Sequence, residues 1–278
     1  SIYTHDVSGT ESTATYNTGY GINSLDAITT GDSNTAVGYT AGSAITTGGF
    51  NTLLGERAGL VHTTGSQNTM VGCLAGSQST EGGDNTFIGM KAGEAVTTGS
   101  NNIAIGVSTL DNADTEGNNL AIGNAALGGA VAGGEYNVAI GNYSLDALTS
   151  SDFNTAVGYQ AGSAVTTGDG NTLFGYQAGL AITGAGAYNV CLGTQAGLAI
   201  TTGIRNTMVG QAGYQFDAEN DNVGIGHAAL GGAINGGEFN VAIGNFSLDA
   251  LTSGDNNVAV GYNAGTSMTD GGNATLIG

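Results

Sequence analysis

A motif of asparagine, two or three apolar or threonine residues and then glycine recurs along almost the whole chain. Successive copies start 17 residues apart, apart from three intervals of 18 residues and one of 16. The extra residues fall in glycine-rich stretches such as Gly133-Gly134, and the apolar positions stay in phase across them. This pattern is typical of stacked turns of one coil, in which insertions are accommodated at the corners.

The consensus turn reads N-T-A-V-G-Y-Q-A-G-S-A-V-T-T-G-D-G, and its residues are numbered here as positions 1 to 17. Position 5 is always glycine, and position 4 is apolar in every copy from Asn34 onwards. A short apolar segment bounded by glycine predicts a β-strand, and a second one follows near position 12, as at Ile45 and Val96. We therefore predict an all-β fold, a parallel β-solenoid or β-roll of about 15 turns with 17 residues per turn. At a strand spacing of roughly 4.8 Å, these turns would form a rod about 70 Å long.

The glycine content supports this prediction because it disfavours a helical fold, which is the main alternative class. The chain has 52 glycines and no proline, and each glycine inside a helix costs about 1 kcal/mol relative to alanine. A helical fold is therefore disfavoured. A collagen-like fold is excluded, because it needs glycine at every third residue together with proline.

The asparagine at position 1 predicts a structural ladder. Identical amides that are stacked one strand spacing apart can donate to one neighbour and accept from the other. A catalytic role for a residue repeated in every turn would make little sense. The predicted ladder residues are Asn34, Asn51, Asn68, Asn85, Asn102, Asn119, Asn137, Asn154, Asn171, Asn189, Asn206, Asn222, Asn240 and Asn257.

The apolar positions also predict self-association. We expect position 4 to face inward because it is apolar in turn after turn, so that position 3 should face water. Position 3 nevertheless holds residues such as Leu53 and Phe87 and is never charged, and position 9 adds leucines such as Leu110. A strand that is apolar on both faces is covered on both faces. We therefore predict that a second apolar stripe packs against other copies of the chain, in a parallel homotrimer.

The two ends of the chain differ from the repeat. Residues 1–16 are polar and are predicted to be a cap or an incoming linker, and residues 17–278 are predicted to be the solenoid. Gly278 follows directly after an apolar strand, whereas solenoid ends normally carry a polar capping turn. We therefore expect the sequence to be a segment of a longer fibre.

Charge and hydropathy exclude several classes of partner. The formal net charge is −19, and the only basic side chains of lysine or arginine are Arg57, Lys91 and Arg205. Binding to nucleic acid needs clustered basic residues to neutralise phosphates, and so does a polybasic membrane contact. No apolar run reaches the 18 residues of a spanning helix. We expect neither a nucleic-acid partner nor membrane insertion.

No catalytic, cofactor-binding or metal-binding set is found. His5, His62 and His227 occupy unrelated repeat positions. Residues 224–229 match a dinucleotide-binding fingerprint in letters, but they follow no βαβ unit. Cys73 and Cys191 lie seven turns apart, much too far for a disulfide, and we expect free thiols. The sequence predicts a protein that is not an enzyme and has no cofactor.

Two repetitive surfaces remain. Tyr39, Tyr159, Tyr176 and Tyr262 follow the glycine of position 5 and would suit glycan contact along the coil; corner packing between chains is the interpretation that we favour for them. Threonine pairs at positions 13 and 14 are a pattern found in ice-binding solenoids. Here they are interrupted by Asp114, Val131, Ala218 and Ile234.

The turns NTAVGYTAG, NTAVGYQAG, NVAIG and NVAVGYNAG resemble two related groups over residues 17–278. One is the head β-roll of trimeric autotransporter adhesins, and the other is the repeat of phage tail fibres. The resemblance implies a left-handed parallel β-roll, a homotrimeric rod and a role in surface attachment. The 17-residue period is longer than the adhesin turn and favours the tail-fibre group.

We accordingly expect the structural shaft of a phage tail fibre, located in the virion and involved in host attachment. Its expected partners are further copies of the chain, other fibre or baseplate proteins, and a cell-surface glycan. The alternatives are a bacterial surface adhesin head, exposed at the cell surface, and an ice-binding β-solenoid.

Overall fold

The computed structural model describes residues 13–278 except for 131–132, 216 and 233–234. The chain divides into two units, Ser1–Asn137 and Val138–Gly278, which are described separately. Most of the predicted N-terminal cap or linker, residues 1–12, lies outside the described residues. Its last residues already join the stack, because the backbone N–H of Thr13 donates to the carbonyl of Thr29 at 3.0 Å.

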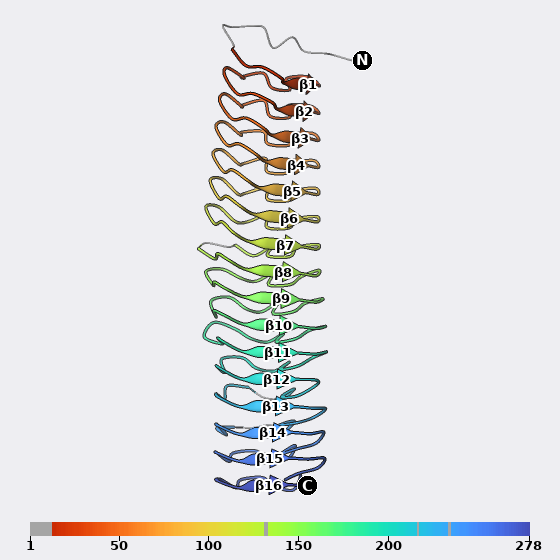
Figure 1. The fold of residues 1–278 in the computed structure, drawn as a ribbon, viewed down its shortest axis with the longest axis vertical. Helices are drawn as coiled ribbons and strands as arrows, with labels where there is room; N and C mark the ends of the chain where they lie inside the picture. Colours follow the sequence, from red (N-terminus) through yellow and green to blue (C-terminus); the bar gives the residue numbers. More distant parts are fainter. Residues whose placement is uncertain (1–12, 131–132, 216, 233–234) are drawn as a thin grey trace. The chain divides into compact units, whose positions relative to one another are not determined.

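Each unit is a stack of three-residue strands (Figure 1). The strands of the first unit are β1 (Thr18–Tyr20), β2 (Thr35–Val37), β3 (Thr52–Leu54), β4 (Thr69–Val71), β5 (Thr86–Ile88), β6 (Ile103–Ile105) and β7 (Leu120–Ile122). Those of the second unit are β8 (Val138–Ile140), β9 (Thr155–Val157), β10 (Thr172–Phe174), β11 (Val190–Leu192), β12 (Thr207–Val209), β13 (Val223–Ile225), β14 (Val241–Ile243), β15 (Val258–Val260) and β16 (Thr275–Ile277).

Within each unit, every strand pairs in parallel with the next strand along the chain. Like positions are paired, so that Thr35 lies beside Thr52 and Val37 beside Leu54. The described residues contain no helix. The predicted all-β parallel solenoid, with about 15 turns of about 17 residues, is confirmed.

The register survives changes in turn length. The pair Thr172–Val190 spans an 18-residue interval, and the pair Thr207–Val223 spans a 16-residue interval, yet both join position 2 to position 2. A slip of one residue would turn every side chain of a strand to the other face. The corners therefore take up the difference in length, as the repeat pattern predicted.

The core side of the strands differs from our expectation. The prediction that position 4 faces inward and position 3 outward is wrong. In β2 to β15, the middle residue of each strand, position 3, is buried, whereas positions 2 and 4 are half-buried or exposed. Successive side chains of a strand point to opposite faces, so a three-residue strand has one inward residue between two outward ones.

Position 9 also belongs to the core and not to an outer stripe. Leu110 is fully buried, and its turn has the small Ala104 at position 3. Where position 3 is large, position 9 is glycine: a Cβ on Gly93 would lie 2.7 Å from the ring of Phe87. The two positions thus share one space in the interior, and a large side chain from one of them fills it to the density usual in protein cores.

Neighbouring turns complete the packing where both positions are small. Ala36 and Gly42 belong to one turn, and a Cβ on Gly42 would lie 2.6 Å from Cδ1 of Leu53 and 3.3 Å from Cδ2 of Leu25. These two leucines come from the turns on either side. The interior is therefore filled within each unit by the chain itself.

Glycine is required at position 5 for two reasons. Gly38 has a φ of +141°, a conformation that L side chains rarely adopt. In addition, a Cβ at this residue would lie 2.3 Å from the carbonyl oxygen of Gly55 in the next turn. The constant glycine therefore allows successive corners to stack directly on each other.

Candidate functional site

The asparagines of position 1 form a buried hydrogen-bonded ladder. The backbone N–H and the Nδ2 of Asn51 both donate to Oδ1 of Asn34, each at 3.0 Å. The same Nδ2 also donates to the carbonyl of Gly65, 3.0 Å away at position 15 of the same turn. Through its oxygen and its nitrogen, a ladder side chain therefore pairs backbone groups that are buried away from water.

The arrangement repeats through both units. All fourteen predicted ladder asparagines are at most 2% exposed. The residues whose backbone N–H donates to Oδ1 of the preceding asparagine are Asn34, Asn51, Asn68, Asn85, Asn102, Asn119 and Asn137 in the first unit, and Asn171, Asn189, Asn206, Asn222, Asn240, Asn257 and Ala274 in the second. Ala274 retains this bond because its backbone N–H is the donor. Such buried amides are not accessible to a ligand.

The predicted glycan-contact tyrosines do not form one row. Tyr39 lies in the first unit and is 48% exposed. In the second unit, the rings of Tyr159 and Tyr176 are stacked nearly in parallel, with centroids 5.7 Å apart. Tyr143 packs edge-on against Tyr159 at 6.1 Å. Each stacked tyrosine therefore has one ring face covered by its neighbour, which leaves less of the ring for a sugar.

Tyr262 belongs to a second aromatic cluster. Its ring meets Phe246 edge-on, with centroids 6.1 Å apart, and Phe246 meets His227 at 5.2 Å. Tyr262 is 67% exposed. The cluster packs corner side chains of successive turns against one another.

The structure contains a second amide ladder, formed by glutamines, which was not predicted from the sequence. Nε2 of Gln177 donates to Oε1 of Gln160 at 2.9 Å, and Gln195 and Gln211 continue the chain of bonds at 3.2 and 3.4 Å. These glutamines lie on the partly exposed corner beside the tyrosine stack. The signal was available, since glutamine fills position 7 in four successive turns.

The threonines of position 13 are engaged in the stack. Oγ1 of Thr46, Thr63 and Thr80 each donates to the carbonyl of position 13 in the next turn. Their hydroxyl protons are therefore not available to an ice lattice. Of the predicted interruptions of this row, Val131 and Ile234 lie outside the described residues.

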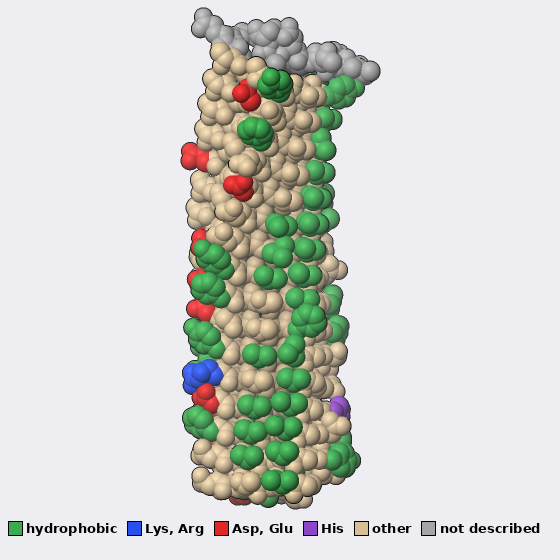
Figure 2. All heavy atoms as spheres, in the orientation of Figure 1, with side chains coloured by type: hydrophobic (Ala, Val, Ile, Leu, Met, Phe, Trp, Pro, Cys, Tyr) green, Lys and Arg blue, Asp and Glu red, His purple; other side chains and the backbone are tan. Residues whose placement is uncertain are grey.

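An exposed apolar face does exist, at positions 2 and 4 of the strands. Figure 2 shows hydrophobic side chains in adjacent rows over strands of the second unit. No residue at either position is charged. Position 4 is apolar throughout and is 37% exposed at Ile88, Ile243 and Val260. We call positions 2 and 4 of the strands the outward face. The sequence predicted an outer apolar stripe but assigned it to the wrong positions.

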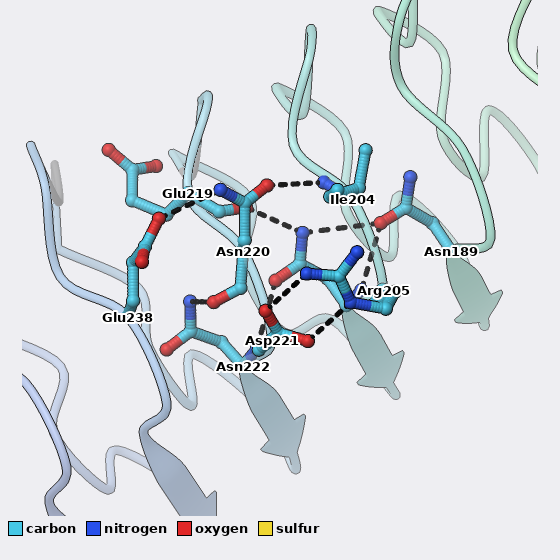
Figure 3. Close-up of polar contacts among 9 residues, drawn as sticks. Asn189, Ile204, Arg205, Glu219, Asn220, Asp221, Asn222 and Glu238 are labelled. Atoms are coloured by element: carbon cyan, nitrogen blue, oxygen red, sulfur yellow. Dashed lines mark hydrogen bonds and ion pairs between the residues drawn. The ribbon is translucent and has the colours of Figure 1, made fainter.

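Charged groups lie at a corner instead. In Figure 3, the guanidinium of Arg205 holds the carboxylate of Asp221 through two bonds of 2.6 and 2.7 Å. This contact lowers the pKa of Asp221 and lies at the surface, where Arg205 is exposed and Asp221 is half-buried. Beside it, Nδ2 of Asn220 donates to Glu238 at 2.7 Å, and Oδ1 of Asn220 accepts the backbone N–H of Ile204 at 2.9 Å.

Two buried glutamates brace enlarged corners. Glu116 and Glu219 are each 5% exposed and replace the usual glycine of position 15. The carboxylate of Glu219 accepts the backbone N–H of Asp217 at 3.1 Å and that of Gly236 at 3.0 Å. Each glutamate thus binds backbone of its own turn and of the next, which is a structural role.

Thiols and metal-binding side chains are the remaining chemistry-bearing groups. Both cysteines are free thiols, as predicted, and burial raises the pKa of Cys191 to about 12. No group of three metal-binding side chains occurs among the described residues. In the same part of the chain, no helix is long and apolar enough to cross a membrane.

Comparisons with known proteins identify no family for this chain. The chain matches no protein-family model, no curated protein and no solved structure. The class that fold and surface define is a parallel β-solenoid with an uncharged, partly apolar outward face.

Proposed function

We propose that the chain is a non-enzymatic structural shaft of a phage tail fibre and that its copies associate through the outward face. The observation that carries this proposal is the row of uncharged side chains at positions 2 and 4 in strand after strand. In the second unit, Val258 and Val260 are 36% and 37% exposed on either side of the buried Ala259. Contiguous apolar surface of this kind marks interaction sites.

The identity of the partner follows from the same face. Parallel sheets are normally covered on both faces, and here only one face is covered by the chain itself. A second copy offers strands of the same spacing and no charge. The acidic residues lie elsewhere and would keep assembled shafts soluble. A parallel homotrimer, in which three outward faces meet, is the arrangement that we propose.

The mechanical role rests on the hydrogen bonds that run from turn to turn. Hydrogen bonds between strands are joined in turn after turn by a bond from a backbone N–H to a ladder amide oxygen, such as that from Asn51 to Oδ1 of Asn34. Such a coil resists local opening, because one turn cannot separate without breaking several bonds at once. The proposed shaft would present a receptor-binding tip and join other fibre or baseplate proteins in the virion. A bacterial adhesin head at the cell surface, the second candidate, uses the same association. The resemblance of turns such as NTAVGYQAG to that group supports it.

The test is the molecular mass in solution, measured by light scattering coupled to size exclusion. A trimer of the 27.2 kDa chain is expected at micromolar concentration. Ile243→Glu places a charge on the outward face at a residue that is 37% exposed and should yield a folded monomer. Ser253→Glu, at an exposed corner residue, is the matched control and should remain trimeric. A stable wild-type monomer defeats the association. Immunogold microscopy of virions and of cells separates the tail-fibre role from the adhesin role.

A further inference from the structure

We propose that His62 is an acid-sensitive joint in the first unit, at which protonation of a buried imidazole loosens the turns on either side. The proposal begins from repeat position 12, whose residues are otherwise apolar and buried at Ile28, Ile45 and Val96. His62 and Ser79 replace them in two successive turns, and both are fully buried.

The ring is tightly held. Its Nε2 lies 2.9 Å from the carbonyl oxygen of Gly65 and 3.2 Å from Nδ2 of Asn68. A Cβ on Gly65 would be 2.3 Å from Cε1 of the ring, so the imidazole packs directly against the Gly65 backbone and occupies the space that a side chain would need there. In the tautomer that bonds the Gly65 carbonyl, the hydrogen is on Nε2 and Nδ2 of Asn68 is a contact rather than a donor to the ring. Nδ1 is then the nitrogen that takes up a proton.

That second nitrogen, Nδ1, is buried without a hydrogen-bond partner, and so is Oγ of Ser79. A buried polar atom without a partner is costly, and a buried charge is more costly still. Protonation at Nδ1 would place a positive charge in the interior beside the otherwise apolar row of position 12.

No ionised side chain offsets that charge. The turn of residues 34–50 carries no charged residue. The charged residues of the next two turns are Glu56, Arg57, Glu81 and Asp84, and all four are exposed. Burial lowers the pKa of His62, and the backbone of Gly65 and Ser79 beside the ring opposes this effect only in part.

The stability around His62 should decrease as the pH falls. A histidine whose folded pKa lies below the unfolded value of 6.5 leaves stability intact above pH 6.5. Stability is then lost as the pH falls from 6.5 to the folded pKa, because the unfolded chain binds the proton more readily. The asparagine ladder carries the effect to neighbouring turns, since Asn68 contacts the ring and also donates to Asn51 at 3.0 Å. The histidine of the second unit, His227, is exposed.

Hydrogen exchange read by mass spectrometry at pH 7.5 and pH 5.0, corrected for intrinsic exchange rates, tests the proposal on the full chain. Peptides covering residues 59–82 should lose up to about tenfold in protection for each pH unit below 6.5, until the folded pKa is reached. Peptides of the second unit should keep their protection. Equal loss in both units, or no loss at 59–82, overturns the proposal.

Two variants distinguish the local effect of His62 protonation from a general sensitivity of the protein to acid. His62→Ile restores the apolar residue of position 12 and should abolish the local loss of protection at pH 5.0. His227→Ala, which removes an exposed histidine, should leave that loss unchanged. A His62→Ile protein that retains the loss rules out the joint. If that variant fails to fold, NMR titration of the His62 imidazole in the wild type decides, since an apparent pKa of 6.5 or higher contradicts the proposal.

Discussion

Oδ1 of Asn34 accepts two hydrogen bonds from Asn51, one from the backbone N–H and one from Nδ2, each at 3.0 Å. This relationship joins a turn to the next one at a buried corner where water cannot serve as a partner. It explains why asparagine is needed at position 1: the short side chain must carry both an acceptor and a donor.

We predict that Asn51→Ala destabilises the protein by about 1–3 kcal/mol, because a buried backbone N–H loses its partner. The backbone N–H of Asn68 loses the acceptor Oδ1 of Asn51, whereas the Gly65 carbonyl loses the donor Nδ2 but keeps Nε2 of His62. Urea unfolding measures the change. Thr47→Ala, at an exposed residue, is the control and should change the free energy of unfolding by less than about 0.5 kcal/mol. A ladder variant no less stable than this control would contradict the role given to the amides.

The shared interior space of positions 3 and 9 predicts a compensating pair. Phe87→Ala should cost about 3–5 kcal/mol by leaving a cavity. Gly93→Leu alone should also destabilise, since a Cβ there already lies 2.7 Å from the Phe87 ring. The double variant reproduces the Ala104–Leu110 pair of the next turn, and it should be more stable than either single variant. A double-mutant cycle of unfolding free energies checks this, and additive losses would show that the two residues do not share a space.

Two glycines with similar backbone angles separate conformation from close approach. Gly38 has a φ of +141° and Gly133 a φ of +112°, but only Gly38 has a carbonyl within 2.3 Å of a built Cβ. Nothing lies within 4 Å of a Cβ at Gly133. We expect Gly133→Ala to cost about 1–3 kcal/mol through strain alone and Gly38→Ala to cost clearly more. Thermal unfolding of the two variants, compared side by side, measures the difference.

The two thiols should differ in reactivity. Cys73 is exposed, whereas Cys191 is buried with a pKa of about 12, and only the thiolate attacks a disulfide reagent. At pH 8, one thiol per chain should react quickly with an aromatic disulfide, and Cys73→Ser should abolish that fast phase. In the unfolded protein, both thiols should react. Rapid labelling of Cys191 in the folded protein would mean that the core around β11 opens readily.

The prediction from sequence failed at one instructive place. It assigned position 4 to the interior because Val37 and its equivalents are always apolar, whereas the structure buries Ala36 and its equivalents. In strands of only three residues, the alternation of side chains gives little signal about which face is inside. The threonine that begins many strands, such as Thr35 in β2, was the available clue, because positions 2 and 4 lie on the same face.

His62 shows a second limit of prediction from sequence. The sequence presents three histidines at unrelated positions, and none stands out. Its burial becomes apparent only when the turns are stacked, because position 12 then forms an apolar row in which His62 and Ser79 are the polar replacements. The Tyr159–Tyr176 stack and the glutamine ladder likewise depend on neighbours 17 or 18 residues away.

The repeat by itself determined the period, the strand at positions 2 to 4, the glycine corners and the expectation of stacked asparagines, whereas the second strand expected near position 12 does not form at Ile45 or Val96. These properties depend on local geometry and on the return of the same residue in each turn, and both can be read along a chain. Only the tertiary structure decided which side chains face inward, how positions 3 and 9 divide the interior, and which residues form the outward face. Those outcomes depend on the direction in which each corner turns the backbone and on volumes contributed by adjacent turns, and neither is encoded in any single repeat.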